Sequence, residues 1–143
     1  MKKILIAFVT LFTFCLSGCD FLTTLTITNP STITFNEIES TVNNYSVSKT
    51  STTQTCVVEL RVKNTGSSTK NISITEGFIQ NKNDESSKSV VFELKYGSES
   101  LYRYDYCLYT VTATIDIEEA FDDYLITFNL NTYSLKIQLE DRE

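Results

Sequence analysis

Residues 56–63 read Cys-Val-Val-Glu-Leu-Arg-Val-Lys, so that apolar and charged side chains alternate along the chain. Successive side chains of an extended chain point to opposite faces of a sheet. The apolar face of this stretch holds Cys56, Val58, Leu60 and Val62. The charged face holds Glu59, Arg61 and Lys63. This alternation predicts an antiparallel strand with one face in a protein core and the other in water.

Similar alternating runs recur on both sides of this strand, and turn residues such as Asn64–Ser68 and Gly97-Ser98 separate them. The longest run covers residues 101–117 and places Cys107 on its apolar face. After residue 19, no long stretch repeats its apolar residues at helical spacing. Seven to nine short strands at such intervals predict an all-β chain folded as an antiparallel β-sandwich.

The last two runs, residues 124–130 and 133–139, are in opposite phase across Asn131-Thr132. A two-residue turn at that point would bring apolar residues opposite each other on one face. The expected pairs are Leu130 with Tyr133, Phe128 with Leu135, and Ile126 with Ile137. We therefore expect a C-terminal β-hairpin with this register.

The N-terminus has the order of a secretory signal peptide. Lys2 and Lys3 precede an apolar run from Ile4 to Leu16, which is shorter than the roughly 20 residues of a transmembrane helix. The run ends in Leu16-Ser17-Gly18-Cys19, which resembles the lipobox of bacterial lipoproteins. That resemblance implies cleavage before Cys19 and acylation of its thiol, for example with palmitate chains. The alternatives are an ordinary secreted protein whose Cys19 pairs with another cysteine, and an apolar helix within a core.

On this interpretation the chain divides into a signal peptide (residues 1–18), a lipidated tether (19–24) and one β-sandwich domain (25–143). The lipid would hold the protein on the cell membrane or the outer membrane, where it faces the periplasm or the cell exterior. The membrane is thus the first expected partner, through the acylated Cys19.

Composition excludes several classes of function. The formal net charge is −6, which disfavours nucleic-acid binding because affinity for phosphate backbones comes mostly from Lys and Arg. Histidine is absent, so neither a Ser-His-Asp triad nor a His-containing zinc site can be assembled. We expect no cofactor, no metal site and no enzymatic activity, with a carboxylate-based enzyme as a remote alternative.

The segment Val58-x-Leu60-x-Val62-x-Asn64-x-Gly66 resembles the strand and turn of immunoglobulin-like (telokin-like) domains in an uncharacterised family of bacterial surface lipoproteins. Cys15 leaves with the signal and Cys19 carries lipid, so Cys56 and Cys107 remain as the pair able to form a disulfide in an oxidising compartment. Their inward phase and spacing also resemble the inter-sheet disulfide of immunoglobulin domains. The alternative is that both are buried free thiols that act as small hydrophobic residues.

Two features are candidates for function. Tyr102, Tyr104 and Tyr106 alternate with charged residues, so in a strand their rings would line up opposite Cys107 and could bind a protein or a glycan. The alternative is that these rings only cover a sheet edge or a loop. Acidic residues cluster in the connection 118–123, where calcium could bind, although such connections are usually just solvated.

The sequence therefore predicts a membrane-anchored lipoprotein that acts as a non-enzymatic binding or adhesion module outside the cytoplasm. A different class remains open, in which the chain is a structural or assembly component of the cell envelope and uses its sheet edges to join a larger complex.

Overall fold

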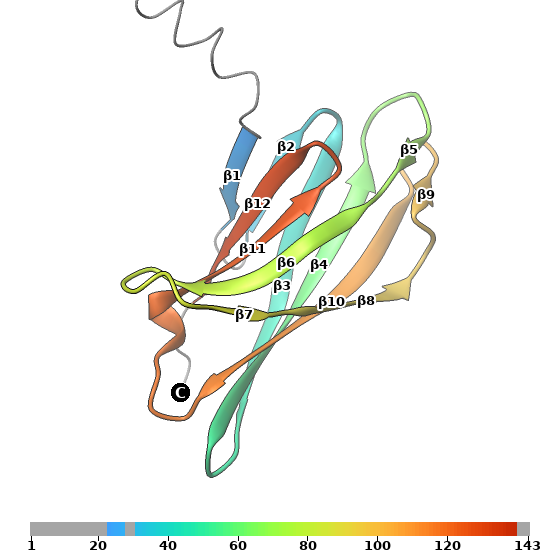
Figure 1. Ribbon diagram of the computed structural model, residues 1–143. Helices are drawn as coiled ribbons and strands as arrows, with labels where there is room; N and C mark the ends of the chain where they lie inside the picture. The colour runs from blue at the N-terminus through green and yellow to red at the C-terminus, as the bar shows by residue number, and fades with distance from the viewer. Residues whose placement is uncertain (1–22, 28–30, 140–143) are drawn as a thin grey trace, which may run out of the picture.

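The computed structural model describes residues 23–27 and 31–139 (Figure 1). The expected signal peptide, the lipobox with Cys19 and the residues up to 22 lie outside the described residues. The first described strand begins at Thr23, two residues before the expected domain boundary at residue 25. In the described part of the chain, no helix is long and apolar enough to cross a membrane.

The described strands form two five-stranded sheets that pack face to face. The first sheet has the order β1 (Thr23–Ile27), β12 (Tyr133–Gln138), β11 (Tyr124–Leu130), β6 (Ile74–Asn81) and β7 (Ser87–Ser89). The second has the order β2 (Ser31–Phe35), β3 (Ile38–Lys49), β4 (Thr53–Asn64), β10 (Tyr106–Asp116) and β8 (Val91–Tyr96). A small third pair joins β5 (Lys70–Asn71) to β9 (Ser100–Leu101), and a 3-10 turn, η2, covers Phe121–Asp123.

The strand order is that of an immunoglobulin-like sandwich. The segment β3-β4-β10-β8 corresponds to strands A, B, E and D, and β12-β11-β6-β7 corresponds to G, F, C and C′. Strand β1 adds to β12 in parallel, while the other strand pairs of the described residues are antiparallel. The expected immunoglobulin-like antiparallel β-sandwich is confirmed, but the described residues form twelve strands and not the expected seven to nine. The additional strands are short pairs such as β5 with β9, which have no alternating apolar run of their own.

The core lies between the sheets and is built from the alternating positions. In β4 every second side chain, from Gln54 to Asn64, is buried, and the four apolar residues of its inner face are fully buried among them. The C-terminal hairpin has the expected register, with Leu130 opposite Tyr133 and Phe128 opposite Leu135. Strand alternation therefore determined both which residues are buried and how the last two strands pair.

The expected Cys56–Cys107 disulfide is contradicted by the structure, in which both cysteines are buried and free. Cys56 lies opposite Ala113 in the β4–β10 ladder, whereas Cys107 lies opposite Val62, six positions further along β4. At about 3.3 Å per residue this separates the thiols by roughly 20 Å, whereas a disulfide needs Cα atoms within about 7 Å. Cys107 is on strand E of the same sheet and not on strand F of the opposite sheet, so the comparison with the immunoglobulin disulfide was wrong.

The sandwich has two distinct ends, and hydrogen bonds show which loops lie at each. Thr23, where β1 begins, is opposite Tyr133, and the adjoining turn residue Asn131 donates its backbone N–H to the Ser73 carbonyl at 2.8 Å. Next to it, Ile72 donates to the Glu99 carbonyl at 2.7 Å. The start of β1 and the β8–β9 connection thus share one end, toward the top of Figure 1, which we call the N-terminal end. The β3–β4 turn, the β6–β7 turn and η2 form the opposite, distal end.

Candidate functional site

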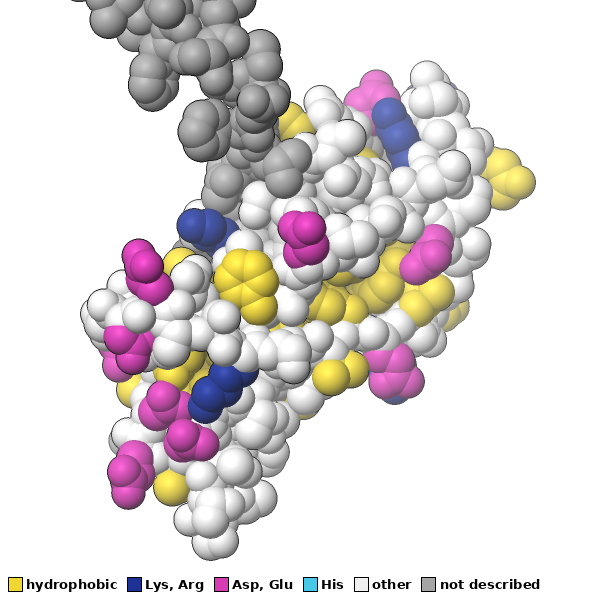
Figure 2. Space-filling view, viewed as in Figure 1, with side chains coloured by type: hydrophobic (Ala, Val, Ile, Leu, Met, Phe, Trp, Pro, Cys, Tyr) yellow, Lys and Arg dark blue, Asp and Glu magenta, His cyan; other side chains and the backbone are white. Residues whose placement is uncertain are grey.

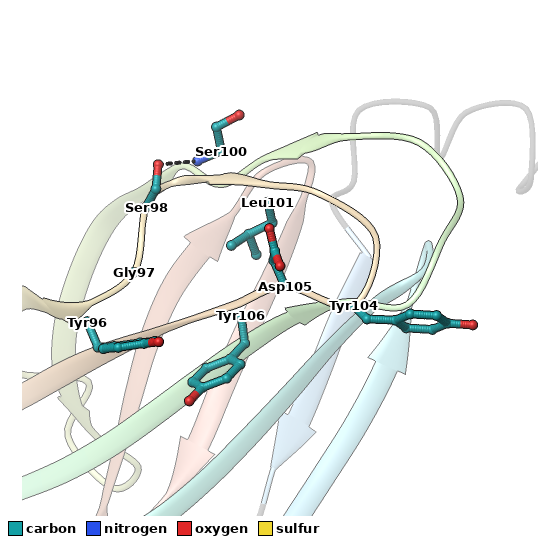
Figure 3. Close-up of a pocket in the computed structure, with 8 residues that line it drawn as sticks. All are labelled: Tyr96, Gly97, Ser98, Ser100, Leu101, Tyr104, Asp105 and Tyr106. Carbon is teal, nitrogen blue, oxygen red and sulfur yellow. Dashed lines mark hydrogen bonds between the residues drawn. The ribbon is translucent and has the colours of Figure 1, made fainter.

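An open hollow of about 320 Å³ lies at the N-terminal end, against the outside of the second sheet (Figure 3). The end of β8, the β8–β9 connection, the turn before β10 and the first residue of β10 form its walls. The lining residues are Tyr96, Gly97, Ser98, Ser100, Leu101, Tyr104, Asp105 and Tyr106. We call the three tyrosines of this lining, Tyr96, Tyr104 and Tyr106, the tyrosine site.

The structure changes the expected arrangement of Tyr102, Tyr104 and Tyr106. Only Tyr106 is in a strand, where it faces away from the core as expected, while Tyr102 and Tyr104 belong to the preceding turn. The three rings therefore do not form a row on one face. All three are nevertheless exposed, at 68%, 58% and 39% of their surface respectively. Tyr104 and Tyr106 line the hollow, and Tyr102 does not.

Tyr96 takes the place of Tyr102 in the site, and sequence periodicity could not have placed it there. Phe92 and Leu94 lie opposite the buried residues Val111 and Tyr109, so simple alternation would point Tyr96 inward as well. A bulge between Leu108 and Tyr109 shifts the register and places Tyr96 opposite Leu108 instead. Bulges redirect side chains in this way.

The redirected ring of Tyr96 stacks on Tyr106, with ring centroids 5.3 Å apart and an interplanar angle of 26°. Such offset stacking contributes about 0.5–1.5 kcal/mol beyond the area that it buries. The two rings, on neighbouring strands, therefore form one stiff aromatic unit on the outer face of the sheet.

Cations lie against the rings of the site. The Arg103 guanidinium carbon is 4.7 Å from the Tyr104 ring centroid, and its Nη2 donates to the Tyr104 hydroxyl at 2.9 Å. Lys63 Nζ is 5.9 Å from the same centroid, and Arg61 is 5.9 Å from that of Tyr106. Arg61 also pairs with Glu39 at 3.6 Å. Within the described residues, Lys63 and Arg103 have no ion-pair partner.

Asn64, at the end of β4, fixes the loops that carry the site. Its side chain is fully buried, and its Nδ2 donates to the carbonyls of Ser68 at 2.7 Å and Leu101 at 3.0 Å. Its Oδ1 accepts the Gly66 N–H at 2.9 Å. One side chain therefore ties the β4–β5 turn to β9. Sequence patterns placed Asn64 in a turn but carried no sign of these bonds, because they join segments far apart in the chain.

The backbone of Asn64 holds the turn that contains Tyr104. The Asn64 carbonyl accepts the Tyr104 N–H at 2.8 Å, and the Asn64 N–H donates to the Asp105 carbonyl at 3.0 Å. Asp105 also accepts the Tyr102 N–H through its carboxylate at 3.2 Å. These bonds hold Tyr104 at φ 66°, a left-handed conformation that is unfavourable for a bulky residue. Such conformations cluster at functional sites, where the surrounding structure determines them.

The acidic connection 118–123 lies at the distal end, away from the hollow. Glu119 accepts hydrogen bonds from the Tyr124 hydroxyl and the Asp116 N–H, and it pairs with Lys88 at 3.4 Å. The Tyr124 hydrogen bond lowers the pKa of the Glu119 carboxyl below its ordinary value. Among the described residues, no group of three or more His, Cys, Asp or Glu side chains is placed to hold a metal ion.

Tyr124 has a structural role that the sequence patterns did not reveal. It is the first residue of β11, which corresponds to strand F, and its ring is buried while its hydroxyl bonds back to Glu119. This is the position of the tyrosine corner in immunoglobulin-like domains, where the hydroxyl bonds to the backbone a few residues upstream. Here it bonds to the side-chain carboxylate of Glu119 instead. In antibody domains the corner tyrosine stands two residues before the cysteine of strand F. Cys107 is on strand E, so the residue two positions before it, Asp105, is not at the tyrosine-corner position.

Comparison with known proteins supports the fold alone. No family model matches the chain, and no curated protein matches its sequence. Among solved structures, the chain is similar to an uncharacterized β-sandwich protein from Clostridium difficile 630, with a TM-score of 0.54 and 10% sequence identity. The similarity covers 85% of this chain and 97% of that one. This chain therefore has a β-sandwich fold that is also found in a protein of uncharacterised function.

Proposed function

We propose that this chain is a bacterial lipoprotein, anchored through Cys19 to the cell membrane or the outer membrane, whose sandwich is a non-enzymatic binding module outside the cytoplasm. The observation that carries the binding role is the tyrosine site, three exposed tyrosines that line an open hollow on a rigid support. The Tyr96 and Tyr106 rings lie side by side, and the Tyr104 ring points outward, away from them (Figure 3). The anchoring rests on the sequence Leu16-Ser17-Gly18-Cys19 after a signal-like apolar run. The expected partners are the membrane, through the lipid on Cys19, and a protein or glycan that the module binds.

The geometry of the site favours binding because the rings are positioned before any partner arrives. Tyrosine offers a large contact area at the cost of ordering only two side-chain torsions. Tyr96 and Tyr106 are already stacked, and Tyr104 is held by Asn64 and Arg103. Ordering of the site on binding therefore costs little free energy, which leaves more of the contact energy as affinity.

The chemistry of the hollow gives little support to catalysis. Asp105 is its one carboxylate, and that group already accepts a hydrogen bond from the Tyr102 N–H. General acid–base catalysis needs a group whose pKa is matched to its task and that reaches the reacting atom. The other residues that line the hollow are tyrosine, serine, glycine and leucine.

Anchoring is tested by fractionation of cells that express the full chain or its Cys19→Ser variant. The original chain should sediment with membranes and be released only by detergent, and its mass should include acyl chains. The variant should lack the acyl mass. Identical masses for the two proteins, apart from the substitution itself, would refute acylation.

Binding is tested by affinity capture from envelope and host-matrix extracts. The bait is the full chain in mild detergent, compared with a variant in which Tyr96, Tyr104 and Tyr106 are changed to Ser. Tyr102→Ser is the matched control, because Tyr102 is more exposed than the others but lies outside the hollow. A partner should be lost with the triple variant and kept with the control. A partner held equally by all three baits would instead favour an assembly role through the sheet edges.

A further inference from the structure

We propose that the tyrosine site docks on the phospholipid surface of the membrane that anchors the chain, so that the domain lies with its N-terminal end against the bilayer. The inference rests on the proposed acylation of Cys19 and names the partner of the same site. Four observations carry it: the length of the tether, the place where β1 begins, the chemistry of the site, and the distribution of charge.

The tether is too short to let the domain stand away from the membrane. Residues 20–22 are the only ones between Cys19 and the first strand residue, Thr23. Because a fully extended chain advances at most about 3.6 Å per residue, Cys19 and Thr23 are separated by no more than about 14 Å. A lipid on Cys19 therefore holds the N-terminal end of the sandwich at the level of the headgroups.

The tyrosine site is at that same end. Thr23 pairs with Tyr133, and the turn just before Tyr133 is hydrogen-bonded from the Asn131 N–H to the Ser73 carbonyl. The next residue, Ile72, donates its N–H to the Glu99 carbonyl beside the hollow. In Figure 1 the start of β1 and the β9 region both lie at the top of the molecule. The start of β1 and the exposed rings are therefore at the same end of the domain.

The residue types of the site suit a membrane interface. Tyrosine is enriched at the level of the lipid headgroups because its ring is apolar and its hydroxyl is polar. Lys63 and Arg103 beside Tyr104 have no ion pair in the described part of the chain, so their charges are available to phosphate groups. Lys and Arg near an anionic surface strengthen attachment. Three other cations of this end are already neutralised, in the pairs Lys70–Glu37, Arg61–Glu39 and Lys95–Glu93.

Acidic residues outnumber basic ones at the opposite end. Among the described residues of the N-terminal end they are equal in number, Glu37, Glu39, Glu76, Glu99 and Asp105 against Arg61, Lys63, Lys70, Lys95 and Arg103. Figure 2 shows Asp and Glu side chains gathered over the β6–β7 turn and the η2 region. The acidic residues of the distal end are Asp84, Glu85, Asp116, Glu118, Glu119, Asp122 and Asp123. The basic residues there are Lys49, Lys82 and Lys88. Because this end is net negative, an anionic membrane repels it and favours the orientation with the tyrosine site down.

A weak contact is sufficient for docking. A short linker gives the tethered partner an effective concentration in the millimolar range. The three exposed rings of the tyrosine site, together with two cations, therefore need only modest intrinsic affinity for headgroups to keep the domain docked.

Tryptophan fluorescence provides the test. The chain contains no tryptophan, so a single introduced tryptophan reports whether its own position lies close to the lipid. The full chain, shown to be acylated by its mass, is reconstituted in vesicles of equal parts phosphatidylglycerol and phosphatidylethanolamine that contain brominated lipid. The Tyr104→Trp variant should be strongly quenched. Ser51→Trp is the matched control, an exposed position in the β3–β4 turn of the distal end, and it should stay unquenched. Equal quenching in the two variants, or no quenching of the Tyr104→Trp variant, overturns the docking.

A pair of charge variants separates docking from anchoring. Lys63→Gln with Arg103→Gln should lower the ratio of docked to undocked domain about thirtyfold, roughly fivefold for each cation removed. Lys49→Gln with Lys82→Gln removes the same charge from the distal end and should not lower the ratio. A chain without the acyl mass would refute the anchoring proposal and, with it, the docking that rests on it. An acylated chain that stays undocked, but still loses a captured protein or glycan in the tyrosine variant, would refute the lipid as partner and leave the binding role intact.

Discussion

Replacing Asn64 with Ala tests whether this residue supports the N-terminal end. The change removes three hydrogen bonds, to Ser68, Leu101 and Gly66, and leaves two carbonyls and one N–H without these partners. Because a typical hydrogen bond contributes about 1 kcal/mol to stability, and an orphaned buried group costs more, we expect a loss of about 3 kcal/mol. For a domain of this size the melting temperature should fall by roughly 10 °C.

The assay is urea unfolding of the full chain in detergent, with circular dichroism of the sheet as the signal. Asn71→Ala is the matched control, because Asn71 is exposed in β5 and has no side-chain hydrogen bond in the described part of the chain. The control should change stability by less than about 0.5 kcal/mol. If Asn64→Ala loses no more than this control, Asn64 does not stabilise the site and the reasoning is refuted.

Three further predictions concern the cysteines, the strained tyrosine and the acidic end. Burial raises the pKa of Cys56 to about 12 and that of Cys107 to about 11, so neither thiol should react with Ellman's reagent at neutral pH before unfolding. A reductant should likewise leave the melting temperature unchanged. A fall in the melting temperature on reduction would show that Cys56 and Cys107 do form a disulfide. Tyr104→Gly should relieve the left-handed backbone and preserve or raise stability, by up to about 1 kcal/mol, while it weakens vesicle docking; a clear loss of stability would show that the ring is structural. Glu119 has a lowered pKa because the Tyr124 hydroxyl bonds to it, so its stabilising effect is present above the ordinary value of 4.5 and is lost as the pH falls through the folded pKa. The difference in unfolding free energy between the original chain and Glu119→Gln should therefore shrink with acidification, as measured by urea unfolding over a pH series, and a constant difference would contradict this.

Local alternation was enough to predict the sandwich because each strand has one buried face. Val58, Leu60 and Val62 identify strand β4 without knowledge of its neighbours, and the phase change at Asn131-Thr132 fixes the final hairpin. Both predictions depend only on residues that are close in sequence. The apolar face of a strand and the register of a tight hairpin follow from short-range geometry.

The site depends on features that short-range patterns do not contain. The alternation of Tyr102, Tyr104 and Tyr106 suggested a strand, but the bonds of Asn64 to Tyr104 and Asp105 bend this segment into a turn. Tyr96 enters the site only because of a bulge that forms between β8 and β10. These interactions join residues far apart in the chain, so only the folded structure brings them together.

The cysteine pair illustrates the same limit at the level of topology. Both Cys56 and Cys107 face the core, as alternation predicted. Whether two inward residues can bond depends on which strands are neighbours and on their register, and here the register separates them by six positions. Spacing along the chain does not contain that information.

The proposed lipid on Cys19 underlies both the membrane anchoring and the docking of the tyrosine site, so both depend on its presence. The decisive measurement is the intact mass of the full chain after expression in a bacterial host and recovery from its membranes. We predict a chain that begins at Cys19 and carries a diacylglyceryl group. A chain that still begins at Met1, or one that begins elsewhere with an unmodified thiol at Cys19, would contradict the anchoring.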